Sequence, residues 1–201
     1  MPNNFSNKEP WFYSRQLLKD NAQFIKGDVI DVGCGDGKHK EVILGLPNIK
    51  SYTGLEQNFK ADIQADLNKR LPIEDNKYDT AILISVLEHL LEPQNALNEI
   101  ARILKPNGYL LLTTVWVYPY HEAPGDYFRY NDKALEYLLG KAGFKVEKVF
   151  SLGGTAMVVF TILRRQLPFL NKISPVVDKL LSLSRKQHKN TPAYFIVARK
   201  K

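Results

Sequence analysis

Three glycines at alternate positions follow a short apolar run near the start of the chain. The run Val29–Val32 leads into Gly33, and Gly35 and Gly37 complete the pattern G-x-G-x-G. Glycine adopts positive φ without strain and lets a ligand approach the backbone closely, because it has no Cβ. Dinucleotide-binding turns have G-x-G-x-x-G spacing instead, and Asp31 just before the turn would repel a pyrophosphate. The turn therefore predicts a nucleotide-like ligand that carries positive charge.

Two acidic residues further along the chain could bind other parts of such a ligand. Glu56 lies 21 residues after Gly35, at the end of a predicted strand over 52–56. A carboxylate at about this distance from a glycine turn can accept hydrogen bonds from the hydroxyls of a ribose. Asp66 follows ten residues later. Each carboxylate could instead be a solvated residue at the end of a strand.

Histidines supply the candidates for a general base. A base with a pKa near neutral pH is best suited to remove a proton from an acceptor group, and this favours histidine. His121 opens the polar and aromatic stretch HEAPGDYFRY, which follows a predicted strand. His89 follows another predicted strand in VLEHL. We predict a catalytic role for His121 and, as the second candidate, His89. We interpret His39 as solvent-exposed and His188 as a surface residue.

The stretch that begins at His121 also predicts an acceptor pocket, because loops at strand ends often carry functional groups. The residues expected to bind the acceptor are Glu122, Tyr127, Arg129 and Tyr130. The alternative interpretation is a lid held together by tyrosine packing and by an ion pair between Arg129 and Asp126. Both interpretations place this stretch over the carboxyl ends of strands.

The elements that must position these residues alternate along the chain. Strands are expected at 28–33, 52–56, 62–63, 78–85, 109–115, 144–150 and 192–199. Helices are expected at 11–25, 38–44, 93–104 and 132–141 from apolar spacing and caps. Strands that alternate with helices indicate an α/β fold with a mostly parallel sheet.

At these residues the chain resembles a known family. The segments VIDVGCGDG (29–37), LPIEDNKYDTAILISVLEHL (71–90) and LKPNGYLLLTT (104–114), with Glu56 and Asp66 between them, are similar to the successive motifs of class I S-adenosylmethionine-dependent methyltransferases. The resemblance covers residues 27–150. It implies a Rossmann-like, seven-stranded, mostly parallel sheet with helices on both faces and an antiparallel last strand. The stretch after His121 more loosely resembles methyltransferases that modify glycans or polysaccharides.

The same resemblance implies a cofactor, S-adenosyl-L-methionine, and a product, S-adenosyl-L-homocysteine. The glycine turn with Asp31 would flank the methionine part, Glu56 would bind the ribose, and Asp66 the adenine amino group. Ser85 and Val86 would lie beside the sulfonium. The cofactor-binding residues expected in this way are Asp31, Gly33, Cys34, Gly35, Gly37, Glu56, Asp66, Leu67, Ser85 and Val86. A glycine turn that only packs a helix is the alternative.

The end of the chain departs from this pattern. We expect a single domain made of an N-terminal helix (1–26), a cofactor-binding core (27–150), a basic amphipathic helical insertion (151–190) and a final strand (191–201). Residues 151–201 contain ten Lys or Arg and one acid, a net charge of +9, whereas the first 150 residues have eighteen bases and twenty acids. A basic apolar insertion suits peripheral contact with an anionic membrane. A homodimer interface or a helical cap are the alternatives.

Composition excludes several classes of protein. With 44% hydrophobic and 24% charged residues, the chain is neither wholly disordered nor collagen-like. One cysteine excludes an intramolecular disulfide and a cysteine-cluster zinc site, and we expect no metal. The first residues lack the apolar run of a signal peptide, so we expect a cytoplasmic protein.

The leading hypothesis is methyl transfer to a hydroxyl of a sugar or another small or lipid-linked acceptor. RNA or protein methylation and a non-catalytic cofactor-binding subunit are the alternatives, and nucleic acid is disfavoured because the basic segment has few aromatic residues.

Overall fold

The computed structural model describes residues 14–58, 60–122, 125–167, 169–170 and 189–201. The elements in chain order are α1 Ser14–Asp20, η2 Ala22–Phe24, β1 Gly27–Val32, α2 Lys40–Leu44, β2 Ile49–Glu56, β3 Ile63–Gln64, β4 Tyr78–Ile84, η3 Leu87–His89, α3 Pro93–Ile103, β5 Leu104–Val115, α4 Asp132–Lys141, β6 Phe144–Ser151, α5 Thr155–Gln166 and β7 Ala193–Lys200. Each strand lies close to its predicted position.

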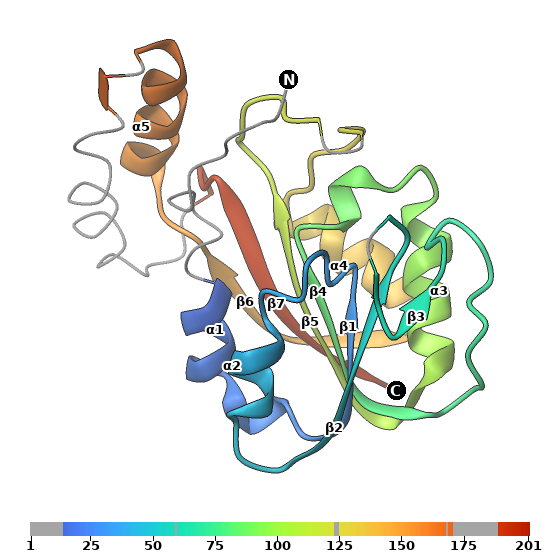
Figure 1. The fold of residues 1–201 in the computed structure, drawn as a ribbon. Helices are drawn as coiled ribbons and strands as arrows, with labels where there is room; N and C mark the ends of the chain where they lie inside the picture. The colour runs from blue at the N-terminus through green and yellow to red at the C-terminus, as the bar shows by residue number, and fades with distance from the viewer. Residues whose placement is uncertain (1–13, 59, 123–124, 168, 171–188) are drawn as a thin grey trace.

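The strands form one seven-stranded sheet in the order β3-β2-β1-β4-β5-β7-β6 (Figure 1). β1 pairs in parallel with β2 and β4, whereas β7 runs antiparallel to β5 and β6. The predicted sheet with its antiparallel last strand is therefore confirmed. The strands β2 and β3 are added on one side of β1, and β4 and the later strands are added on its other side. The strand order therefore reverses between β1 and β4. In open α/β sheets, ligands bind beyond the carboxyl ends of the strands at such a reversal.

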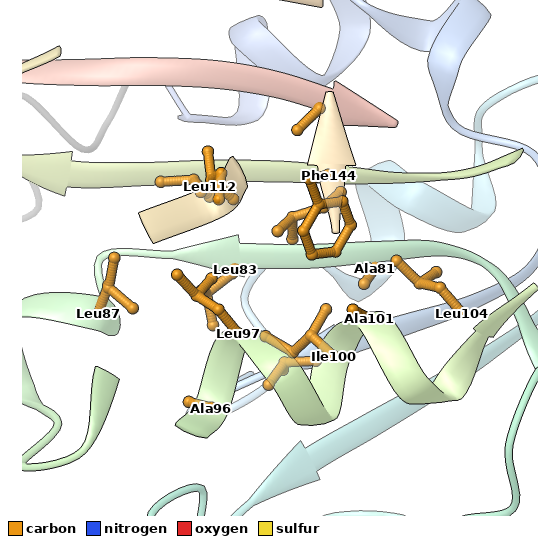
Figure 2. Close-up of a cluster of buried hydrophobic side chains, with 14 of the residues drawn as sticks. Ala81, Leu83, Leu87, Ala96, Leu97, Ile100, Ala101, Leu104, Leu112 and Phe144 are labelled. Carbon is orange, nitrogen blue, oxygen red and sulfur yellow. The ribbon is translucent and has the colours of Figure 1, made fainter. Parts of the chain in front are cut away.

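Helices cover both faces of the sheet (Figure 1). On one face, Leu97 of α3 and Leu83 of β4 belong to the same buried cluster (Figure 2). On the other face, Leu18 of α1 and Ile43 of α2 are buried together with Ile82 of β4. Successive residues of a strand point to opposite faces. Strand β4 is therefore buried on both sides, as its nearly continuous apolar sequence predicts.

Local signals explain where the helices begin and end. Pro93 stands at the first turn of α3, where its missing N–H costs no hydrogen bond. The side chain of Asn131 caps α4 by accepting a hydrogen bond from the backbone N–H of Ala134 at 2.8 Å. The chain turns directly from α3 into β5, and Asn107 adopts a φ of 64° there. The predicted helix stop at 105–108 is thus the first part of β5.

The insertion contributes helix α5, which extends away from the helices that cover the sheet (Figure 1). Met157 and Thr161 are buried, whereas Val159 is 50% exposed, Ile162 42% and Leu163 43%. The helix therefore buries one side and leaves apolar side chains of its other side in solvent. Residues 171–188 of the predicted insertion lie outside the described residues. Within the described part of the chain, no helix is long and apolar enough to cross a membrane.

Candidate functional site

A cavity of about 320 Å³ lies where β1, β2 and β4 end. This volume is at the lower end of the range of roughly 300–1,000 Å³ that is typical of small-molecule sites. The sequence-predicted residues that line it are Gly33, Gly35, Glu56, Leu67, Ser85, Val86, His89 and Tyr127. The reversal of strand order thus brings together side chains from the glycine turn, the next two long strands and the loop after β5.

The glycine turn forms one wall of the cavity. Gly33, Gly35 and Gly37 all have positive φ, of 74°, 57° and 79°. A Cβ at Gly33 would lie 2.5 Å from a methyl carbon of Val86, which is closer than side chains tolerate. A Cβ at Gly35 would meet no atom within 4 Å, so only its backbone conformation requires glycine there. The turn therefore leaves open space beside Gly35 for a close-fitting ligand.

Glu56 links the turn to the end of β2. One of its carboxylate oxygens accepts a hydrogen bond from the N–H of Gly35 at 3.0 Å. The other accepts from the N–H groups of Gln57 at 2.7 Å and Asn58 at 3.3 Å. These bonds fix the carboxylate at the cavity wall. Carboxylate oxygens each accept more than one hydrogen bond, so Glu56 keeps acceptor capacity for ligand hydroxyls.

Asp66 lies just outside the cavity wall, between lining residues Ala65 and Leu67. Its carboxylate accepts two hydrogen bonds from Asn68 at 3.0 Å and lies 3.3 Å from the Lys69 ammonium. The backbone hydrogen bond from Asn68 lowers the pKa of Asp66, so the group stays ionised. In the structure, Asp66 stabilises the turn that places Leu67 and Asn68 in the cavity wall.

Asp31 and Cys34 lie behind the glycine turn instead of in the cavity wall. Asp31 is 1% exposed and accepts a hydrogen bond from the Tyr52 hydroxyl at 3.0 Å. Burial raises the pKa of Asp31 to about 7, although the bond from Tyr52 opposes this. Burial also raises the pKa of the Cys34 thiol to about 11, which leaves it protonated and unreactive at neutral pH. Gly37 is likewise not among the lining residues.

The interpretation of His39 as solvent-exposed is wrong. His39 is 2% exposed because α1 covers it, and its Nε2 atom lies 2.9 Å from the hydroxyl of Ser14 in that helix. Its Nδ1 atom is 3.9 Å from Asp31. Burial lowers the pKa of His39 to about 4, and the cations Lys38 and Arg15 lower it further. His39 is therefore a neutral, buried residue that joins α1 to the core.

The two candidate bases lie side by side at the rim of the cavity. The rings of His89 and His121 pack edge to face, with centroids 5.0 Å apart. His89 lines the cavity, whereas His121 lies behind it. The Nδ1 atom of His89 is hydrogen-bonded to the carbonyl oxygen of Gly125. The Nδ1 atom of His121 lies 3.5 Å from the carboxylate of Asp126. The fold therefore joins two histidines that are 32 residues apart in sequence.

The loop after β5 has the ion pair that the lid interpretation predicts. Arg129 binds both carboxylate oxygens of Asp126 and donates to the carbonyls of Tyr118 and Pro119. Burial alone would raise the pKa of Asp126, but the bonds from Arg129 and from the N–H of His121 lower it to about 2. These bonds tie Asp126 and Arg129 to the residues that directly follow β5.

The four residues predicted to bind the acceptor occupy different environments in the structure. Tyr127 lines the cavity. Arg129 is bound to Asp126 and to the carbonyls of Tyr118 and Pro119, as described above. Tyr130 is 4% exposed, and its hydroxyl donates to the carbonyl of Leu87 at 3.4 Å. Glu122 is exposed and hydrogen-bonded to the hydroxyl of Tyr120. Among these four, Tyr127 alone borders the cavity, while Tyr130 and Arg129 support it from behind.

Glu88 is the residue at this site that sequence reasoning missed. It is 0% exposed, and one of its carboxylate oxygens accepts a hydrogen bond from Thr114 at 2.8 Å. Its backbone carbonyl accepts from the N–H groups of Tyr127 and Phe128. Burial raises the pKa of Glu88. The only sequence signal was its place between a buried strand and His89, where an acidic residue is more often solvated.

Comparisons with known proteins agree with this geometry. Residues 30–112 match the family model described as a methyltransferase domain. The chain is 30% identical over 159 residues to the tRNA U34 carboxymethyltransferase of Nautilia profundicola, a match that covers 67% of this chain and 53% of the relative. It is 28% identical over 105 residues to a ubiquinone biosynthesis O-methyltransferase of Coxiella burnetii, covering 45% of each. The chain thus spans about half the length of these curated relatives.

Solved structures show the same fold. A SAM-dependent methyltransferase from Archaeoglobus fulgidus matches with a TM-score of 0.65 and 16% identity, and the match covers 94% of each chain. At this identity the likeness concerns the fold alone. The motifs in order, the sheet topology and the match to the family model agree with one another. Residues 30–112 therefore match a methyltransferase domain, and the chain has the fold of class I S-adenosylmethionine-dependent methyltransferases, so the resemblance seen in the sequence is confirmed.

Proposed function

We propose that the protein transfers a methyl group from S-adenosylmethionine to a hydroxyl group of a small acceptor, such as a sugar or a lipid-linked molecule. The observation that carries the proposal is the shared cavity. Glycine-turn residues and Glu56 line one part of it, and His89 and Tyr127 line another. A cofactor held by the first set would present its reactive end toward the second.

The residues at the cavity fit such a cofactor. The open space beside Gly35 admits a ligand against the backbone, and the Glu56 carboxylate offers acceptors to ribose hydroxyls. Ser85 has a φ of 54°, a rare conformation for a non-glycine residue, and lines the cavity after β4. Such local strain is found more often at functional sites. When bound, the cofactor supplies an electrophilic methyl group on a sulfonium, and its demethylated product leaves after transfer.

The histidine pair would handle the proton of the acceptor. Transfer to a hydroxyl forms an O–CH₃ bond, breaks the S–CH₃ bond and releases the hydroxyl proton. We assign that proton to the His89–His121 pair, with His121 as the predicted base and His89 between it and the cavity. Tyr127 and the segment held by the Asp126–Arg129 pair would orient the acceptor and exclude water.

A lipid-linked acceptor is supported by helix α5. Its exposed apolar side chains Val159, Ile162 and Leu163 belong to the segment in which the chain concentrates its positive charge. Apolar groups next to cations suit the surface of an anionic membrane. Liposome flotation tests this contact: the proposal expects binding that requires anionic lipid and weakens at high salt. A compact dimer that never floats would favour the interface or cap interpretation instead.

An RNA acceptor is the second candidate, because the Nautilia relative is named as a tRNA carboxymethyltransferase. The net charge of +9 over residues 151–201 would suit phosphates. The two candidates differ in what is methylated. An acceptor screen by mass spectrometry should show a gain of about 14 daltons on a small hydroxyl compound, the mass of the CH₂ that methylation adds. The same gain on RNA alone would support the second candidate.

Isothermal titration with S-adenosylmethionine and its demethylated product tests the cofactor assignment first. Wild-type protein should bind both, and Glu56→Ala should weaken binding by about 1–3 kcal/mol, as expected for lost charge-assisted hydrogen bonds. Absence of binding to either compound would contradict the proposed function. Binding without turnover on any acceptor would indicate a non-catalytic subunit.

A further inference from the structure

One carboxylate and two imidazoles meet beside the cavity. Glu88, His89 and His121 each offer a metal-ligating atom, and these atoms lie within 4.8 Å of one another. The first two are neighbours in the short helix after β4, and the third comes from the loop after β5. A histidine pair with one carboxylate is a recurrent ligand set for divalent transition metals, and it leaves coordination positions open.

A second, independent observation points to a missing ligand. The Oε1 atom of Glu88 is buried and makes no hydrogen bond within the described residues. The other oxygen is bonded to Thr114, so the side chain is held in place with one oxygen unsatisfied. An unpaired oxygen of a buried carboxylate is costly unless something binds it. A cation between the three side chains would remove this cost.

The groups behind the two histidines have the arrangement of a supporting shell. The Nδ1 atom of His89 bonds the carbonyl of Gly125, and that of His121 faces Asp126 at 3.5 Å. Metal-ligating histidines usually direct one ring nitrogen to a carbonyl or carboxylate and leave the other for the ion. Arg129 in turn fixes Asp126. Asp126 and Arg129 balance each other as an ion pair, so an ionised Glu88 would add a negative charge that a bound cation neutralises.

We propose that Glu88, His89 and His121 form a binding site for one divalent transition-metal ion of the zinc type, next to the cofactor cavity. Imidazole favours such ions over Mg²⁺, which prefers oxygen ligands. Ligand atoms about 2.1 Å from a tetrahedral ion are roughly 3.4 Å apart, so separations of up to 4.8 Å would shorten by at most about 1.4 Å. This proposal departs from the sequence-based expectation that the chain binds no metal.

If the proposed function holds, the ion would also help to activate the acceptor hydroxyl, and this consequence rests on that function. A hydroxyl oxygen coordinated at an open position loses its proton more readily, because the ion stabilises the oxyanion. His121 would then act as a ligand, and the acceptor proton would pass to water. Metal binding itself is independent of methyl transfer and can be measured without cofactor or acceptor.

The test uses a tag-free chain of residues 1–201 that has been stripped with a chelator and titrated separately with ZnCl₂ and MgCl₂. One Zn²⁺ per chain and no Mg²⁺ are expected. Glu88→Gln keeps the shape of the side chain and the acceptor for Thr114, yet should weaken Zn²⁺ binding at least about 100-fold, because loss of even a supporting partner costs 10–100-fold. Asp126→Asn should cost about 10–100-fold. His39→Gln is the matched control and should bind Zn²⁺ as wild type does.

Binding of S-adenosylhomocysteine to each variant shows that it is folded and keeps the two proposals separable. Wild-type protein that binds this compound but not Zn²⁺ would overturn the metal site and leave the proposed function standing. Equal Zn²⁺ affinity in wild type and Glu88→Gln would also overturn it. Stoichiometric Zn²⁺ binding that depends on Glu88, with no affinity for the cofactor, would support the metal site and contradict the proposed function.

Discussion

Two buried histidine–carboxylate clusters lie on opposite sides of the sheet, and they differ in one respect. His39 is buried beneath α1 next to the Ser14 hydroxyl, and the buried Asp31 accepts a hydrogen bond from Tyr52. In the second cluster, Glu88 retains a buried oxygen without a hydrogen bond, and its neighbour His89 lines the cavity. The same residue types thus serve the core in one place and a candidate active site in the other.

The difference shows that residue type does not distinguish the two roles here. Burial is nearly complete at both carboxylates, with 1% exposure for Asp31 and 0% for Glu88. Burial also raises the pKa of both groups. What separates them is access to a cavity and an unfilled hydrogen-bonding position. A buried polar network that is fully bonded rigidifies the fold, whereas an incomplete one indicates a place for a ligand.

The largest effect is expected at the glycine turn that separates the clusters. Gly33→Val would place a side chain 2.5 Å from Val86, and valine tolerates a φ of 74° poorly. We expect loss of detectable S-adenosylmethionine binding, measured by isothermal titration. Gly140→Ala is the matched control, since its Cβ would meet no atom within 4 Å in α4. Wild-type affinity in Gly33→Val would remove the turn from the site.

The two clusters should respond differently to loss of a histidine. We expect His121→Ala to reduce turnover by about 10²–10⁴-fold with little change in cofactor affinity, because a base or a metal ligand is lost. His39→Gln should leave turnover within a few-fold of wild type and lower the melting temperature instead. Steady-state kinetics and thermal unfolding of both variants check this. A larger loss for His89→Ala would exchange the roles of His89 and His121, and a large loss for His39→Gln would break the comparison.

Much of the core was predictable because local signals specify it. The run before Gly33 is a strand, the apolar spacing of 93–103 is a helix, and Glu56 does end β2. Glycine spacing and apolar periodicity depend on residues that are close in sequence. The order and spacing of these motifs along the chain also indicated the family. Fold and cofactor were therefore accessible from sequence alone.

The roles of buried polar residues were not predictable in the same way. His39 is buried because α1, 19 or more residues earlier, packs over it. Tyr130 was expected in the acceptor pocket, yet its ring stacks with Phe128 and its hydroxyl bonds the backbone of η3. The partners of Glu88 come from β5 and from the loop that follows. Such contacts are set by tertiary packing, which no local pattern encodes.

The smallest effect is expected from Asp31→Asn and concerns stability as a function of pH. The pKa of Asp31 is raised to about 7 in the folded protein, against an ordinary value near 3.9 in the unfolded chain. The folded state therefore holds this proton more tightly. Its stabilising contribution is complete below about pH 4 and is lost as the pH rises through 7. Asparagine keeps an acceptor for Tyr52 but cannot ionise, so the variant should not lose this contribution.

Urea unfolding of the wild type and Asp31→Asn at pH 5 and pH 8, without cofactor, measures the effect. The variant should gain about 2–3 kcal/mol relative to wild type between these two pH values, which is the linkage expected for a shift of this size. His39 acts in the opposite sense, because its pKa is lowered to about 4 and its contribution is lost as the pH falls below 6.5. The loss of stability that His39 causes at low pH occurs in both proteins. The difference in their free energies of unfolding therefore reports on Asp31. A difference that stays constant with pH would mean that Asp31 is ionised in the folded core and that a cation neutralises it there, in which case the two clusters would be more alike than their hydrogen bonds indicate.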